Sequence, residues 1–148
     1  MNAIIRPASI EDIDAMTQLL RELFEIEEDF NFDQVKQAQG LALIVNSPNS
    51  RVFVAESDGL IIGMCTVQLL ISTAEGGYVG LVEDMVVSHP YIGKGIGRKL
   101  LTELETWSKA KGLTRLQLLA DVNNQPALVF YRKMGWSDTS LVGVRKLI

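Results

Sequence analysis

The chain contains only one cysteine, Cys65, and only one histidine, His89. A single cysteine excludes an intrachain disulfide and is typical of a reducing compartment. Apolar runs of about 20 residues, which a membrane-spanning helix needs, are absent, and the N-terminus lacks the apolar core of a signal peptide. These absences predict a cytoplasmic protein without a membrane partner.

Positive charge is also scarce in this sequence. Its 148 residues include 14 Lys and Arg against 18 Asp and Glu, which gives a formal net charge of −4. A nucleic-acid-binding domain favours a basic face, so we expect no nucleic-acid partner, and we predict no metal site. The length and the 47% of hydrophobic residues predict one globular domain over residues 1–148.

The hydrophobic pattern switches between helical and strand periods and predicts an α/β fold. The sheet is expected to be mixed and mainly antiparallel, with two helices before a pair of hairpins and two after them. A terminal strand over residues 136–148 would offer an edge at which a homodimer pairs. The expected strands cover residues 3–6, 51–56, 60–71, 78–87, 113–119 and 136–148, and the expected helices run from a Ser9 cap to 26, 33–45, 96–111 and 124–134.

The most informative stretch is a strand, a glycine-rich turn and a helix. Residues 82–87 form the strand, 88–95 the turn, and apolar residues from Ile96 onward recur at helical spacing. The unpaired N–H groups at the start of such a helix attract an anion. Gly93, Gly95 and Gly97 let phosphate oxygens approach the backbone. Neither the P-loop pattern nor the dinucleotide fingerprint fits this stretch.

The run V-x-x-x-x-x-x-G-K-G-I-G-R-x-L-L, which follows a strand containing Glu-Asp, resembles the acetyl-CoA-binding motif of the GNAT family of N-acetyltransferases. That motif is usually written [QR]-x-x-G-x-[GA]. Gly95 and Gly97 match its glycines, whereas Ile92 stands at its first position. The resemblance implies acetyl-CoA as acyl donor, bound by residues Met85, Val86, Val87, Ile92, Gly93, Lys94, Gly95, Ile96, Gly97, Arg98, Asn124 and Tyr131.

A second run, N-x-x-A-x-x-F-Y-x-x-x-G-W from Asn124 to Trp136, is similar to the second motif of the same family. The resemblance implies that Tyr131 is the general acid that protonates the leaving CoA thiolate. Asn124 is expected either to bond the cofactor arm or to cap the helix. The two motifs stand in the family's order, and the resemblance covers most of the chain from Arg51 onward.

Two adjacent carboxylates, Glu83 and Asp84, lie on the strand before the turn. Strand alternation predicts that they point to opposite faces, so that only one faces a substrate cleft, and the sequence leaves the choice open. The run LVEDMVV resembles the small-amine and diamine acetyltransferases of the family, which implies that Glu83 is the base, acting through water. It also implies that the Val87 backbone pairs with the pantetheine arm or holds the thioester oxygen.

These features predict an N-acetyltransferase that moves an acetyl group from acetyl-CoA to a primary amine by direct attack. The acceptor is expected to be a small cationic metabolite, attracted by the acidic bend of Glu25, Glu27, Glu28, Asp29 and Asp33, although this bend is also consistent with a solvated surface. The alternatives are a non-catalytic acyl-CoA sensor, an enzyme acting on a protein or peptide amine, and a nucleotide-binding domain of another class. Cys65 is expected to be a small apolar strand residue.

Overall fold

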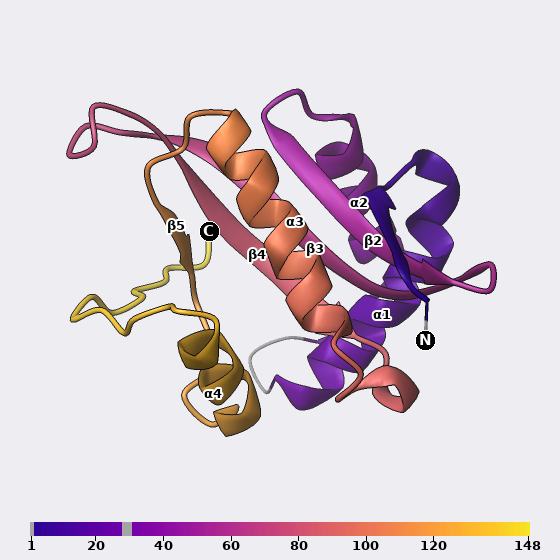
Figure 1. Ribbon diagram of the computed structural model, residues 1–148. Coiled ribbons are helices and arrows are strands. Elements are labelled where there is room, and N and C mark those ends of the chain that lie inside the picture. Colours follow the sequence, from indigo (N-terminus) through magenta and orange to yellow (C-terminus); the bar gives the residue numbers. More distant parts are fainter. Residues whose placement is uncertain (1, 28–30) are drawn as a thin grey trace. The chain divides into compact units, whose positions relative to one another are not determined.

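The computed structural model describes residues 2–27 and 31–148. It divides into two compact units, residues 1–118 and 119–148. The first unit holds a five-stranded sheet in the order β1-β2-β3-β4-β5 with helices α1, α2 and α3, and the second unit holds α4 (Gln125–Lys133) (Figure 1). The predicted α/β fold with a mixed, mainly antiparallel sheet is confirmed, whereas the extent of a single domain stays a prediction.

The sheet is an antiparallel meander with one parallel strand added at its edge. Strands β1 to β4 pair antiparallel in chain order, and β5 pairs parallel with β4. The strands are β1 (Ile4–Pro7), β2 (Ser50–Ser57), β3 (Leu60–Ser72), β4 (Gly77–Val87) and β5 (Leu116–Leu118), and the longer helices of this unit are α1 (Ile13–Ile26), α2 (Gln34–Asn46) and α3 (Ile96–Ala110).

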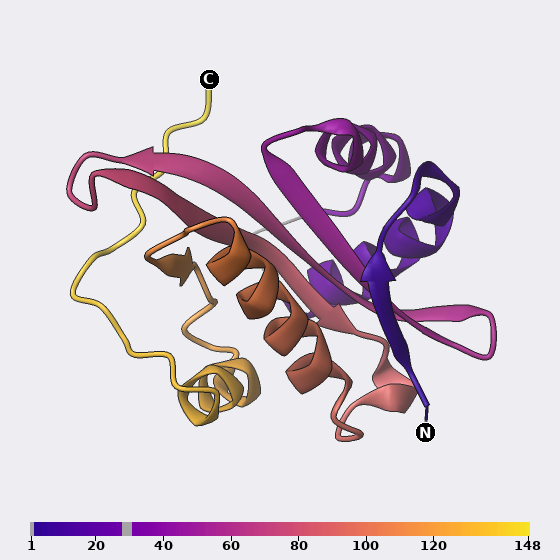
Figure 2. The ribbon, with the colours of Figure 1, turned by 45° about the horizontal axis from the view of Figure 1, so that its top comes forward.

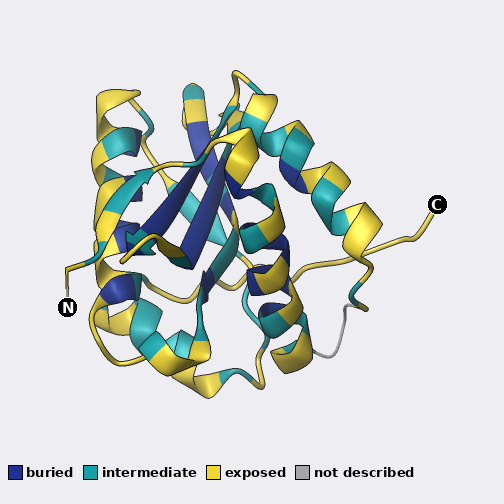
Figure 3. Cartoon of the chain, turned by 90° about the vertical axis from the view of Figure 1, so that its right-hand side faces the viewer, coloured by how far each residue is buried: buried dark blue, intermediate teal, exposed yellow. Residues whose placement is uncertain are grey.

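The helices of the first unit cover the two faces of the sheet. Helices α1 and α2 lie on one face and α3 lies on the other (Figure 2). The α1 and α2 face is built on buried Met16, Leu20 and Leu41, which pack with Val54 and Met64 of the sheet. The central strands are the most deeply buried part of the chain (Figure 3).

A glycine sets the distance between α3 and the sheet. A Cβ atom at Gly63 would lie 3.1 Å from Leu100 Cδ1 and 3.3 Å from Ile96 Cγ2. The residue therefore marks a close approach, as its place in a strand predicts. The β2–β3 register also shifts beside it, between Ala55 and Glu56.

The helix ends follow the capping rules that the sequence predicts. The Ser9 N–H donates to Asp12 Oδ2 at 2.8 Å, which is one half of the predicted capping box. Asp33 caps α2 by accepting from the Val35 and Lys36 N–H groups, and Asn124 caps α4 by accepting from the Ala127 N–H. None of the helices in the described residues is long and apolar enough to span a bilayer.

The predicted strand over residues 136–148 is wrong, because the structure assigns no strand there. Its apolar residues Leu141, Val142 and Val144 are 71–91% exposed. Alternating apolar residues make a segment compatible with a strand, but a strand also needs a partner backbone to complete its ladder. The predicted homodimer edge loses its basis for the same reason. The strand predicted over 113–119 shrinks to Leu116–Leu118.

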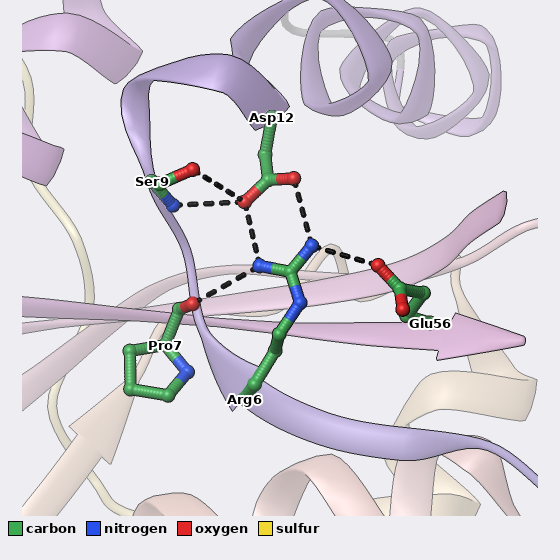
Figure 4. Close-up of polar contacts among 5 residues, drawn as sticks. All are labelled: Arg6, Pro7, Ser9, Asp12 and Glu56. Carbon is green, nitrogen blue, oxygen red and sulfur yellow. Dashed lines mark hydrogen bonds and ion pairs between the residues drawn. The ribbon is translucent and has the colours of Figure 1, made fainter. Parts of the chain in front are cut away.

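One ion-pair network joins the start of the chain to the sheet. The Arg6 guanidinium donates to both oxygens of Asp12, at 2.8 and 2.9 Å, and to Glu56 at 2.9 Å (Figure 4). The hydrogen bond from Arg6 holds the pKa of Asp12 below its ordinary 3.8. The network therefore fixes β1, the start of α1 and β2 together.

Replacing Asp12 with Ala should lower the free energy of unfolding by about 1–3 kcal/mol at pH 7, because Arg6 and the Ser9 N–H lose a charged partner. The exposed Arg132–Asp138 pair is the control, and Asp138→Ala should cost less than about 1 kcal/mol. Because folding lowers the pKa of Asp12, its contribution is present above pH 3.8 and is lost below it. Denaturant titration at pH 7 and pH 3 measures both effects, and equal costs for the two variants would contradict this role.

Candidate active site

The glycine-rich turn after β4 forms an open backbone cradle. Gly93 and Gly95 both have φ of +81°, a left-handed conformation that is strained for residues with a side chain. A Cβ atom at either position would meet nothing within 4 Å. The space in front of this backbone is therefore free for a ligand, as the sequence predicts.

The same turn opens directly into α3, and the helix start is not capped by a side chain. Its N-cap residue is Gly95, and the first bond of the helix runs from the Lys99 N–H to the Gly95 carbonyl at 3.1 Å. The N–H groups before Lys99 therefore have no acceptor within the helix. Lys94 and Arg98 are exposed beside them, so the turn can hold an anionic group such as a pyrophosphate.

The backbone of Val87 points away from β3. The Ser88 N–H donates to the Ile62 carbonyl at 2.8 Å, and Val87 pairs with Gly63 in the next register position. Hydrogen-bonded and non-hydrogen-bonded pairs alternate in an antiparallel ladder, so the Val87 N–H and C=O point toward the β5 side. There β4 pairs with β5 only over Gly80–Val82.

Val87 thus has the backbone orientation that its predicted role requires. By contrast, the Val86 side chain is buried in the core, so the prediction of cofactor binding by Val86 concerns its backbone alone.

The prediction that Glu83 and Asp84 point to opposite faces is wrong. The β3–β4 register shifts at this point: Cys65 pairs with Met85 and Val67 pairs with Val82. One residue of β3, Thr66, therefore stands opposite both carboxylate residues of β4. A β-bulge of this kind changes the direction in which a side chain points. Both carboxylates therefore line the same cavity.

This cavity has a volume of about 640 Å³ and lies between α1, α2 and the sheet. Its lining residues come from five elements of the first unit. They are Leu20, Phe24, Lys36, Gln37, Gly40, Leu41, Leu43, Ile44, Ser47, Ser50, Gln68, Glu83 and Asp84. Apart from the two carboxylates, no sequence signal singles out these residues, because a cavity wall has the same composition as a half-buried helix face.

Asp84 is the carboxylate with the most unusual environment. Its N–H donates to Thr66 Oγ1 at 3.0 Å, and the Thr66 hydroxyl donates back to its Oδ2 at 3.3 Å. Burial and the neighbouring charge of Glu83 raise the pKa of Asp84 to about 6, and the charge of Glu27 adds to the effect. Asp84 therefore changes its charge close to neutral pH, which is a property of many catalytic acids and bases.

The acidic bend of the sequence is only partly within the described residues. Glu27 acts on Asp84 as stated, and Asp33 serves as the cap of α2. Glu28 and Asp29 lie outside the described residues. Glu25, Glu27 and Asp33 are the members of the bend that the structure describes, and the attraction of a cation by this bend stays a prediction.

The second unit carries two of the predicted site residues, Asn124 and Tyr131. Tyr131 lies on α4, with its ring centroid 5.3 Å from that of Phe130 and 5.7 Å from that of Trp136. Asn124 caps the same helix through its side-chain oxygen. The structure therefore supports the capping alternative for Asn124, and the role of Tyr131 stays a prediction.

Two further side chains bear on the site. Cys65 is fully buried, and burial raises the pKa of its thiol to about 12, so it is a core residue and unsuited to act as a nucleophile. Glu22 of α1, which the sequence analysis missed, accepts from the His89 N–H at 3.1 Å and from the Ser88 hydroxyl. It ties α1 to the start of the glycine-rich turn.

The family model for the acetyltransferase (GNAT) family matches residues 13–136, which include both motifs, the glycine turn and the carboxylate pair. The chain belongs to the GNAT family. Two relatives agree with this membership, and one solved structure shares the fold.

An aminoalkylphosphonate N-acetyltransferase of Salmonella typhimurium is 25% identical, over 91% of this chain and 85% of its own. An IAA acetyltransferase of Azospirillum brasilense is 32% identical, over 88% and 82%. The crystal structure of a transcriptional regulator from Bacillus halodurans is 23% identical, has a TM-score of 0.86 and covers 99% and 100% of the two chains, which shows the shared fold. The family and these relatives identify this GNAT protein as an acetyl-CoA-dependent N-acetyltransferase.

Proposed function

We propose that the enzyme acetylates a small cationic primary amine, which enters the cavity between α1, α2 and the sheet. The observation that carries the proposal is the pair of carboxylates, Glu83 and Asp84, at the wall of this cavity. Two negative charges at one wall favour a protonated amine over a neutral or anionic group. The Salmonella relative, which is named for an amine-bearing alkylphosphonate, is a further example of a small amine acceptor.

In the first step the amine must lose a proton, and the Glu83–Asp84 pair is suited to accept it. A base works best when its pKa is near the operating pH, and the pKa of Asp84 lies at about 6. Glu83 is more exposed and is suited to pass the proton through water. We assign proton acceptance to the pair as a unit, because both carboxylates line the same wall of the cavity.

Acetyl-CoA supplies the acetyl group, and the open backbone at Gly93 and Gly95 fits its pyrophosphate. Lys94 and Arg98 add positive charge at the same place. In this proposal the Val87 N–H donates to the thioester oxygen as negative charge develops on it, a contribution worth about 3–4 kcal/mol for donors of this kind. The Tyr131 hydroxyl gives a proton to the leaving sulfur.

The proposal is tested by thiol release from acetyl-CoA on addition of primary amines. We expect release with small cationic amines and much less with peptides that present an N-terminus or a lysine. Preferred turnover of peptides would contradict the proposed acceptor class. Binding of acetyl-CoA without amine-dependent release would instead indicate a sensor.

The pH profile of kcat/KM separates the two carboxylates. In wild type, kcat/KM should fall about tenfold per pH unit below about pH 6, because Asp84 becomes protonated there. Asp84→Asn should lower kcat/KM at pH 7.5 by about 100-fold or more and remove this limb. Glu83→Gln should move the limb to lower pH, because the charge of Glu83 helps to raise the pKa of Asp84.

Each variant is compared with wild type at the same pH. The effect of amine ionisation on kcat/KM is then the same for both proteins and cancels in their ratio. Glu75→Gln, in an exposed turn, is the control and should leave the profile unchanged. A limb near pH 6 that persists in Asp84→Asn would remove Asp84 from proton transfer.

Replacing Tyr131 with Phe should lower kcat by about 100-fold or more, because the sulfur loses its proton donor. The change keeps the ring that packs on Phe130 and Trp136, so the Kd for CoA should stay within about twofold. Steady-state kinetics and CoA titration measure the two quantities. Equal turnover in the two proteins would exclude Tyr131 as the acid.

A further inference from the structure

The walls of the cavity, away from its carboxylates, are mostly hydrocarbon. Leu20 and Leu41 are buried and belong to the core, and Phe24 and Ile44 pack against it. Leu43 is 75% exposed and lines the same cavity. An occupant that reaches Glu83 and Asp84 with one end therefore has its remaining atoms against apolar side chains, which favours burial of carbon there.

A glycine in the middle of α2, Gly40, lies on the solvent-exposed part of the cavity wall. Gly40 lies at the seventh position of a 13-residue helix and lines the cavity. Glycine is among the least favourable residues in a helix interior. No close approach to another element explains it, because a Cβ atom at Gly40 would meet nothing within 4 Å. The missing side chain leaves room for an occupant.

The charges around the cavity disfavour a second charged group on the occupant. A second ammonium would find no further carboxylate among the lining residues, where the remaining charge is that of Lys36 and the polar groups are the neutral side chains of Gln37, Ser47, Ser50 and Gln68. It would exchange its hydration for neutral hydrogen bonds beside apolar side chains. A carboxylate or phosphonate would be repelled by the Glu83–Asp84 pair. Lys36 offers it little compensation, because its side chain is exposed to solvent and exposed ion pairs are weak.

We propose that the preferred acceptor is a primary monoamine with an apolar, uncharged body, whose ammonium lies at Glu83 and Asp84 and whose body fills the space beside Gly40. This inference rests on the proposed function, since it assumes that the cavity is the acceptor site. It narrows the acceptor from small cationic amines in general to an alkylamine or arylalkylamine.

The test compares three amines of nearly the same length that differ at the far end: pentylamine, 1,4-diaminobutane and 4-aminobutanoate. We expect kcat/KM for pentylamine to exceed those for the other two by at least about tenfold. From ethylamine to pentylamine, kcat/KM should rise by about fourfold for each methylene that enters the apolar cavity. Phenylethylamine should also be accepted well.

The variant Gly40→Leu fills the proposed space and shows where the body of the amine lies. We expect kcat/KM for pentylamine and phenylethylamine to fall at least tenfold, whereas that for ethylamine changes less than threefold. Gln39→Leu, which adds the same side chain at the neighbouring position outside this cavity, should change none of them. Gly40→Ala, which adds only a methyl group and favours the helix, gives a smaller effect of the same sign if Gly40→Leu folds poorly.

The outcomes separate the two levels of the proposal. Highest turnover of 1,4-diaminobutane or 4-aminobutanoate would overturn the apolar-amine inference and leave the proposed function standing. So would an unchanged preference in Gly40→Leu. Absence of turnover with every amine, by a protein that binds acetyl-CoA, would overturn the proposed function itself.

Discussion

At Gly63, α3 lies so close to β3 that the Cβ atom of any side chain would be tightly crowded. A Cβ atom there would stand 3.2 Å from the Val86 carbonyl oxygen as well as against two side chains of α3. This contact holds the start of α3 over the end of β4, where the Val87 backbone points away from β3. The N–H groups at the start of the helix and at the end of the strand therefore belong to elements that pack directly on each other.

A second constraint acts on the other face of the same strand. The register shift opposite Thr66 brings two carboxylates to one cavity wall, where the charge of Glu83 adds to the effect of burial in raising the pKa of Asp84. Asp84 is held at this wall because the fully buried Thr66 side chain makes hydrogen bonds with its main chain and its side chain. Strand β4 thus presents backbone groups at its end, at Val87, and two carboxylates shortly before it, at Glu83 and Asp84.

The sequence predicted those parts of the structure whose signals are local. Glycine spacing indicated the turn before Ile96, and a capping residue such as Asn124 indicated where a helix begins. The bulge at Glu83–Asp84 was not predictable, because it depends on the register of β4 against β3 and on no residue of β4 alone. The open space at Gly40 depends on how α2 packs. Residues 136–148 show the opposite failure, since their alternating pattern predicted a strand that has no paired ladder.

Binding of acetyl-CoA at the turn that contains Gly93 and Gly95 is the step on which the proposed activity most directly depends. The measurement is thermal unfolding with acetyl-CoA, CoA, ATP or NAD added separately. At a ligand concentration of 100 Kd, binding should stabilise the protein by about 2.7 kcal/mol. The account predicts stabilisation by acetyl-CoA and CoA and none by ATP or NAD. Stabilisation by none of the four, or by ATP or NAD to the same degree, would contradict it.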